Sequence, residues 1–148
     1  MTYATQKPQN NNPTNWFIKT LQKIKKEENY ILDFENATVP SLPNCATTET
    51  FDGSNTWDTT IVNDYGFDSN VLRYNYNNNN AANTWFYTQA ISLTAGTEYK
   101  ISYKYGNNSA TTTEKLKTYL ATSPNPASVS STLSDHASIT GGTAVDFG

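Results

Sequence analysis

The chain has 148 residues, of which 16% are charged and 13% are aromatic, and its formal net charge is −3. This length predicts one domain, and the charged share lies below the roughly 25% that is usual for soluble domains. Residues 1–30 carry five Lys and two Glu, whereas residues 31–148 carry five basic and eleven acidic groups. The acidic part has a single Arg, Arg73, so we expect no phosphate-binding surface there and no nucleic-acid binding.

The N-terminal part predicts a polar leader followed by an amphipathic helix. Residues 1–12 are rich in Asn and Gln, and Asn12 and Pro13 then fit a helix cap and a first helical position. Apolar residues follow at helical spacing, with Lys on the other side (Phe17, Leu21, Ile24). We therefore expect a helix over Thr14–Asn29. Three interpretations of this helix remain open. It is docked on the rest of the domain, it is a leader or a mis-joined segment that packs loosely, or it binds a membrane surface.

From Tyr30 onward the pattern changes to short strands separated by turn residues. Residues 127–148 are weakly patterned, with a helical turn or an irregular loop over Ser128–Leu133. The predicted strands are the segment YILDFENA, which begins at Tyr30, and then Thr47–Phe51, Trp57–Val62, Val71–Tyr76 and Lys115–Thr122.

The stretch Asn83–Asn107 predicts a hairpin. Its first strand is Trp85–Leu93, and its second is Tyr99–Tyr105, where large side chains alternate with polar ones. The residues between them, Thr94-Ala95-Gly96, suit a tight turn. Because no βαβ alternation is present, residues 30–148 predict an all-β fold, an antiparallel sandwich of two sheets.

These segments resemble a known family. The series DFENATVPSLPNC, NVLRYNYNNN, NTWFYTQAISLTAGTEYKISYKYG and LKTYLATSPNPAS is similar to the jelly-roll adhesin domains of Bacteroidetes surface proteins. That family is the cleaved-adhesin or choice-of-anchor J group, distantly like MAM domains, and the resemblance covers about residues 31–147. The residues that match its central motif are Trp85, Thr88, Ile91, Leu93, Ala95, Gly96 and Tyr99.

Three departures from this family pattern shape our expectations. Ala46 stands where a Trp often follows the Asn-Cys pair, the family's final strands are missing, and the N-terminal helix has no counterpart. The resemblance therefore implies an incomplete jelly roll, truncated at its C-terminal end. Such a fragment would leave a sheet edge unpaired and open to self-association.

Asp33 and Glu35 are the candidate metal ligands. They fall on one face of the predicted opening strand, and hard cations such as Ca²⁺ bind several oxygen ligands. The resemblance implies a structural Ca²⁺ near this strand in the complete domain. The alternative is a solvated strand face or a cap.

Trp57, Tyr76 and Trp85 are the candidate ligand-binding residues. Exposed aromatic rings beside amides are typical of sugar-binding faces, because the ring stacks on C–H groups while the amides donate and accept hydrogen bonds. Asn75 and the run Asn77–Asn80 would supply such amides. The alternative is that the alternating aromatic residues belong to the core and that the Asn run is an ordinary loop.

Nothing in the sequence points to catalysis. Cys45 is the only cysteine, so there is no intrachain disulfide, and neither its position nor that of the only histidine, His136, favours a catalytic Cys-His pair. Phosphate-binding loops, dinucleotide-binding motifs and nucleophile elbows do not occur. We therefore expect no enzyme.

Two functions remain as expectations. The first is a non-catalytic adhesion or carbohydrate-binding module of a secreted or cell-surface bacterial protein, with a glycan or a host or cell-surface protein as partner. The second is a structural accessory domain that spaces or stabilises a neighbouring secreted enzyme such as a peptidase. The extracellular location follows from the resemblance, while the chain itself carries no signal-peptide pattern and no apolar run long enough to span a membrane.

Overall fold

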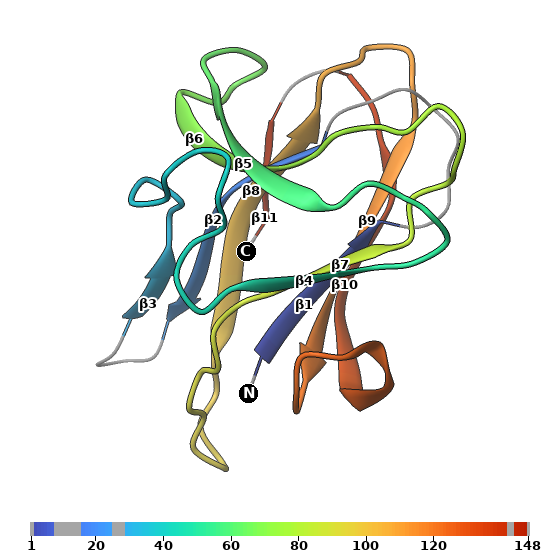
Figure 1. Ribbon diagram of the computed structural model, residues 1–148. Helices are drawn as coiled ribbons and strands as arrows, with labels where there is room; N and C mark the ends of the chain where they lie inside the picture. Colours follow the sequence, from blue (N-terminus) through green and yellow to red (C-terminus); the bar gives the residue numbers. More distant parts are fainter. Residues whose placement is uncertain (1, 8–15, 25–28, 142–143, 148) are drawn as a thin grey trace.

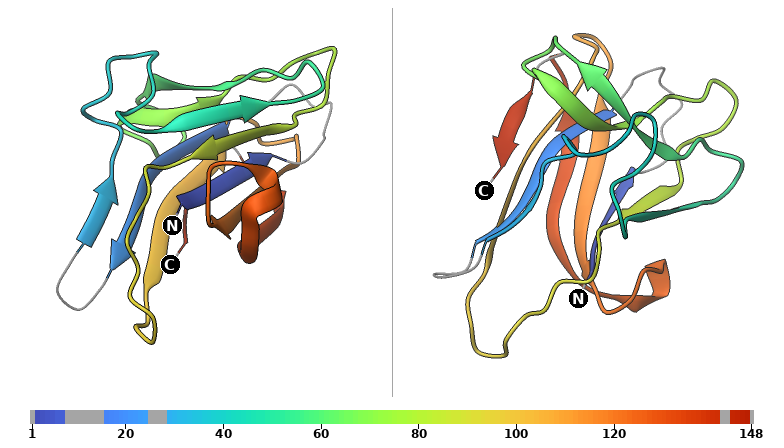
Figure 2. Two further views of the ribbon diagram at one scale, coloured as in Figure 1. Left: turned by 60° about the horizontal axis from the view of Figure 1, so that its bottom comes forward. Right: turned by 60° about the vertical axis from the view of Figure 1, so that its left-hand side comes forward.

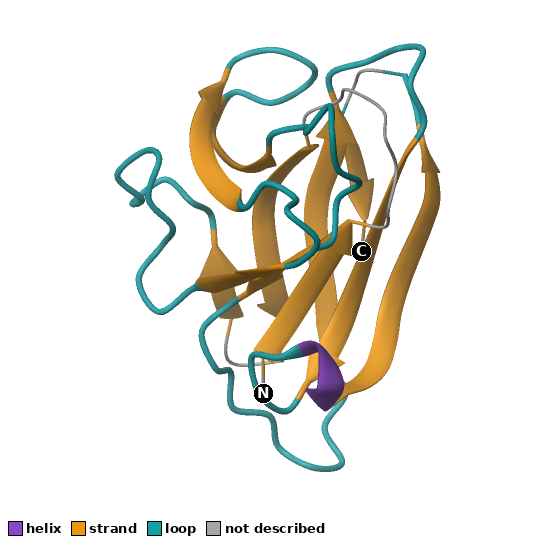
Figure 3. Ribbon diagram, turned by 45° about the vertical axis from the view of Figure 1, so that its right-hand side comes forward, coloured by secondary structure: helices purple, strands orange, loops and turns teal. Residues whose placement is uncertain are grey.

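The computed structural model describes residues 2–7, 16–24, 29–141 and 144–147. These residues are nearly all in strands and loops, and their one helical element is a single 3₁₀ turn, η1 (Pro126–Ser128) (Figure 3). The strands are β1 (Thr2–Lys7), β2 (Trp16–Ile24), β3 (Asn29–Leu32), β4 (Thr47–Thr50), β5 (Trp57–Val62), β6 (Ser69–Tyr74), β7 (Thr84–Tyr87), β8 (Lys100–Asn107), β9 (Glu114–Ala121), β10 (Val129–Ile139) and β11 (Val145–Phe147).

The strands form two antiparallel sheets (Figure 1). Sheet A has the order β10-β9-β1-β7-β4, and sheet B has the order β11-β8-β2-β6-β5, with β3 paired to β2. Neighbouring strands in both sheets run in opposite directions. This arrangement agrees with the predicted all-β class.

One hydrophobic core joins the two sheets. Phe86 and Leu116 come from sheet A, whereas Ile18, Leu72 and Tyr103 come from sheet B, and all five are buried in the same cluster. Strand residues alternate between the two faces of a sheet, so each sheet contributes every second side chain to this layer. The fold is therefore compatible with a β-sandwich.

The predicted N-terminal helix is wrong where the structure describes it. Trp16–Ile24 is strand β2, which pairs with β8 along one side and with β6 and β3 along the other. Strand pairing on both sides satisfies the backbone groups that a helix would have satisfied internally, and it outweighs the weak helical spacing of the apolar residues. Ile18, fully buried, fixes this strand against the core.

The predicted polar leader also contributes to a sheet, since Thr2–Lys7 forms strand β1 between β9 and β7. Both N-terminal strands thus lie inside their sheets rather than at the edges (Figure 2). The sheets therefore include segments on both sides of Tyr30, where the sequence pattern changes. Residues 8–15 and 25–28 of the predicted leader and helix lie outside the described part.

The predicted hairpin over Asn83–Asn107 is also wrong, although part of it is confirmed. A tight turn does occur at Thr94–Thr97, where the Thr97 amide donates to the Thr94 carbonyl at 3.2 Å. However, β7 belongs to sheet A and β8 to sheet B. The segment 88–99 therefore crosses from one sheet to the other, and Thr88 and Ile91 are buried along it.

The other strand predictions differ in accuracy. Trp57–Val62 is confirmed with the same bounds, and β4, β6 and β9 lie within two residues of their predicted limits. The strand YILDFENA is shorter than expected, since β3 ends at Leu32 and the next residues turn, with Phe34 at a φ of +63°. The long strand β10 forms where an irregular segment was predicted. Its pairing with β9 contains bulges, which interrupt the alternation of inward and outward side chains, so the sequence shows no regular strand pattern there.

Candidate functional site

The three predicted aromatic ligand residues lie in different environments. Trp57 is 2% exposed and contacts Tyr74 edge-on, with ring centroids 5.9 Å apart, so its indole belongs to the core. Trp85 is 6% exposed, whereas Tyr76 is 36% exposed. The structure does not bring the three rings together on one open face, and Tyr76 is the one that solvent reaches.

Trp85 takes part in a second aromatic cluster. It stacks on Tyr119 and Tyr87, with centroid distances of 5.2 and 6.2 Å. The Tyr87 hydroxyl donates to Oε2 of Glu49 at 3.0 Å. Burial, and then this hydrogen bond and the Glu49 charge, raise the pKa of Tyr87 far above its ordinary value. The cluster is therefore covered and internally bonded, unlike an open stacking surface.

The amides that sequence analysis singled out lie in two adjacent loops, residues 51–56 and 75–83, which we call the asparagine loops (Figure 1, right). Side-chain amides of one loop bind backbone carbonyls of the other. Asn55 Nδ2 donates to the carbonyls of Asn75 and Tyr76 at 3.1 and 2.9 Å. Asn77 and Asn80 donate to the Gly53 carbonyl at 3.1 and 3.0 Å. These bonds hold the two loops against each other.

The asparagine run also fixes its own backbone. Oδ1 of Asn77 accepts from the amides of Asn79 and Asn80 at 2.8 and 3.2 Å, a local bonding pattern that Asn favours in turns. Asn83 Nδ2 donates to Oδ2 of Asp52 at 2.6 Å. Most of these amides therefore stabilise the conformation of the loops. Asn78 and Asn79 remain exposed at the tip of the second loop.

Two aromatic rings flank this locked surface. Phe51 is 38% exposed and begins the first loop, and Tyr76 lies near the start of the second. The Phe51 amide donates to the Asn83 carbonyl at 2.8 Å, and the Tyr76 carbonyl accepts from Asn55, so both residues are anchored through their backbones. The side chains are thus presented to solvent from a backbone that is held in place.

The predicted metal ligands Asp33 and Glu35 lie in a turn after β3, beside a cleft of about 190 Å³. Oδ1 of Asp33 accepts the Glu35 amide at 3.1 Å, and the Glu35 carboxylate accepts the Ser69 hydroxyl. Asp33 lines the cleft and Glu35 does not. No group of three or more His, Cys, Asp or Glu side chains suited to a metal ion occurs among the residues described. The calcium expectation stays a prediction.

A polar cluster between the two sheets was missed by sequence analysis. The Tyr103 hydroxyl lies 2.6 Å from Oγ of Ser134 and 2.6 Å from Nε2 of His136, and Thr118 lies 2.6 Å from Ser134. Burial lowers the pKa of His136, with a partly opposing effect of Asp135, and burial raises the pKa of Tyr103.

No local motif marks this cluster in the sequence, because its members come from β8, β9 and β10. The alternation of Tyr103 with its polar neighbours predicts an inward ring, but the partners on the other sheet follow only from the topology. Tyr105 stacks on the His136 ring at 4.1 Å and helps to cover it. The cluster is internally satisfied.

Cys45 and His136 do not form a catalytic pair. Cys45 is exposed and precedes β4, at one edge of sheet A, whereas His136 lies on β10 at the opposite edge. Four strand spacings separate these edges, roughly 19 Å. The thiol and the imidazole are therefore too far apart for proton transfer.

Comparisons of the chain with models of known protein families, with curated proteins and with solved structures found no match. None of the helices in the described part is long and apolar enough to cross a membrane.

Proposed function

We propose that this chain is a non-catalytic adhesion or carbohydrate-binding module of a secreted or cell-surface bacterial protein, built as a jelly roll, and that the asparagine loops carry its ligand site. The observation that supports this proposal most directly is the set of bonds that lock the two loops together. Asn55, Asn77 and Asn80 bind carbonyls of the facing loop, so the surface exists before a ligand arrives. Such preorganisation reduces the entropy lost on binding.

The chemistry of this surface suits a neutral sugar. Phe51 and Tyr76 offer partly exposed rings, and Asn78 and Asn79 offer exposed amides. Ring faces contact the C–H groups of a sugar, while amides pair with hydroxyls that act as both donors and acceptors. Trp57 and Trp85, which are nearly covered, contribute through the fold instead.

A glycan array probed with the full chain tests the proposal, followed by calorimetry with each glycan that binds. We expect Tyr76→Ala and Phe51→Ala each to weaken binding at least about tenfold, as residues at the centre of an interface do. Ile61→Ala is the matched control, because Ile61 is 61% exposed on β5, away from the asparagine loops. Binding that survives both aromatic substitutions would contradict this location.

The second candidate is the structural accessory domain appended to a secreted enzyme. It is supported by the extent to which the amides and aromatic rings already bind each other rather than solvent. Absence of binding to any glycan at about millimolar concentration would favour this candidate.

A further inference from the structure

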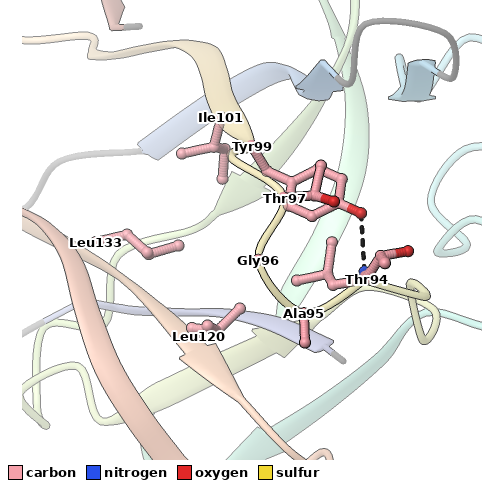
Figure 4. A pocket seen from close by; sticks show the side chains of 9 residues that line it. Thr94, Ala95, Gly96, Thr97, Tyr99, Ile101, Leu120 and Leu133 are labelled. Atoms are coloured by element: carbon pink, nitrogen blue, oxygen red, sulfur yellow. Dashed lines mark hydrogen bonds between the residues drawn. The ribbon is translucent and has the colours of Figure 1, made fainter.

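A cavity of about 470 Å³ opens at one end of the fold, where segment 88–99 crosses between the sheets. Figure 4 shows its walls: Leu120 of β9 and Leu133 of β10 face the turn that contains Ala95 and Gly96, and Ile101 of β8 lies beside them. The lining is thus contributed by both sheets and by the crossing segment.

The turn in the crossing segment is fixed by a hydrogen bond within that segment. The Thr94 amide donates to the Tyr99 hydroxyl at 2.8 Å, which places the Tyr99 ring along one wall (Figure 4). Gly96, at a φ of +78°, allows the tight turn, and a Cβ built there would meet no atom within 4 Å. The turn beside the cavity is therefore fixed by a hydrogen bond and a glycine.

A bulge in β10 completes the opposite wall. Thr132 pairs with Tyr119 and Ser134 pairs with Thr118, so Leu133 is an extra residue between two register positions. The bulge brings Leu133 to the cavity while Ser134 stays in the interior. Two leucines from neighbouring strands thereby form a continuous aliphatic wall.

The inner neighbours of this lining are polar but satisfied. Tyr103 lies two residues beyond Ile101 on β8, and Thr118 lies two residues before Leu120 on β9. The Tyr103 hydroxyl lies 2.6 to 3.4 Å from polar atoms of Thr118, Ser134 and His136. The Thr118 hydroxyl lies 2.6 Å from Ser134. They therefore do not require a polar group from a ligand.

Among the described residues, the nine that line the cavity carry no charge. A ligand that buried a charge or an unpaired polar group here would lose its hydration without compensation. Hydrocarbon does not suffer this loss, and the cavity volume lies within the range of small-molecule sites.

From this lining we propose that the cavity binds the hydrocarbon chain of a small amphipathic molecule, whose polar head remains at the mouth beside Thr94 and Thr97. This ligand site is separate from the asparagine loops and does not depend on their function. The turn at Thr94–Thr97 forms the outer wall, so a chain can enter between the turn and the two leucines (Figure 4).

A series of 1-alkanols from 1-butanol to 1-nonanol tests the proposal on the full chain, since these probes differ in chain length at a constant neutral head. We expect saturable binding by NMR, with the largest shifts at the methyl groups of Leu93, Leu120 and Leu133. Each added methylene should tighten binding about fourfold until the cavity is full, which corresponds to ~0.8 kcal/mol per buried CH₂.

Two cavity-filling variants give the decisive comparison. Leu133→Phe should weaken 1-octanol binding at least about tenfold, because its ring occupies the cavity. Ala95→Trp adds bulk from an exposed position, so it keeps the test available if Leu133→Phe does not fold. Ile61→Phe, on the exposed face of β5, is the control that should bind as the unaltered chain does.

Three results would overturn the proposal. The first is no saturable binding of any alkanol, and the second is an affinity that does not depend on chain length. The third is binding that persists at full strength in the folded filling variants, because it would place the hydrocarbon elsewhere on the molecule.

Discussion

Nε2 of His136 and the hydroxyl of Tyr103 lie 2.6 Å apart, and this contact joins β10 of sheet A to β8 of sheet B. The same hydroxyl lies 2.6 Å from Ser134, so one phenol oxygen links side chains of the two sheets. His136 is the only histidine in the chain. The ordinary pKa of its imidazole lies near neutral pH, unlike that of the Tyr103 phenol.

Acidification should destabilise the fold through His136. Its pKa is lowered in the folded state by burial, partly opposed by Asp135, from an ordinary value of 6.5. The unfolded chain therefore binds a proton more readily, and stability falls as the pH drops from 6.5 toward the folded-state pKa. Urea denaturation at about pH 7.5 and about pH 5.5 should show a lower midpoint at the acidic value.

The control for this pH dependence is His136→Gln, which keeps a polar side chain opposite Tyr103 but does not titrate. Because no other histidine is present, the difference between the two pH values should largely disappear in this variant. An unchanged pH dependence would assign the effect to carboxylates instead.

Tyr103→Phe should lower the free energy of unfolding by ~1–3 kcal/mol, since it removes the hydrogen bonds of a buried hydroxyl. The partners of this hydroxyl are Ser134, Thr118 and His136. Tyr105→Phe is the matched control, because Tyr105 contacts the same histidine through its ring face. Equal losses in the two variants, measured by urea denaturation, would show that the hydroxyl network adds nothing.

Trp57→Ala should cost ~3–5 kcal/mol of stability, as expected for a large aromatic side chain removed from a core. Trp57 is 2% exposed and packs on Tyr74, so its loss leaves a cavity between the sheets. Tyr76→Ala, at a position 36% exposed, should cost much less. Thermal or urea denaturation separates the two, and a fully stable Trp57→Ala variant would be incompatible with the observed packing.

Asn77→Ala should loosen the asparagine loops, because this side chain donates to Gly53 and accepts from the amides of Asn79 and Asn80. We expect faster hydrogen exchange at these two amides and a loss of ~1–2 kcal/mol. Asn78→Ala, from the exposed tip of the same run, provides the comparison. If both variants exchange at the same rate, Asn77 does not hold the turn.

Local pattern was sufficient where a segment is bounded by clear turn residues. The segment Trp57–Val62 was predicted with its true bounds because Gly53 and the loop after Val62 delimit it. The all-β class followed from several such segments. By contrast, Trp16–Ile24 contains both aromatic and β-branched residues at spacings that a helix also accepts, and only its partners β8 and β6 decide its state.

The candidate sites show the same limit. The asparagine run was recognisable in the sequence, but its pairing with Gly53 and Asn55 required the two loops to be placed side by side. The cavity wall at Leu133 depends on a bulge, which a regular alternation cannot predict. Sequence spacing also could not show that Tyr119 of β9 stacks on Trp85 of β7, because the two rings come from different strands.

The position of β1 has a consequence for synthesis on the ribosome. Thr2 pairs with Ala121, and Gln6 pairs with Lys117, so the first strand cannot gain its β9 neighbour until the chain has grown by more than a hundred residues. At a synthesis rate of about 5–20 residues per second, this delay lasts on the order of 6–24 s. During that interval the edge of β1 that later pairs with β9 stays unpaired and open to pairing with other strands.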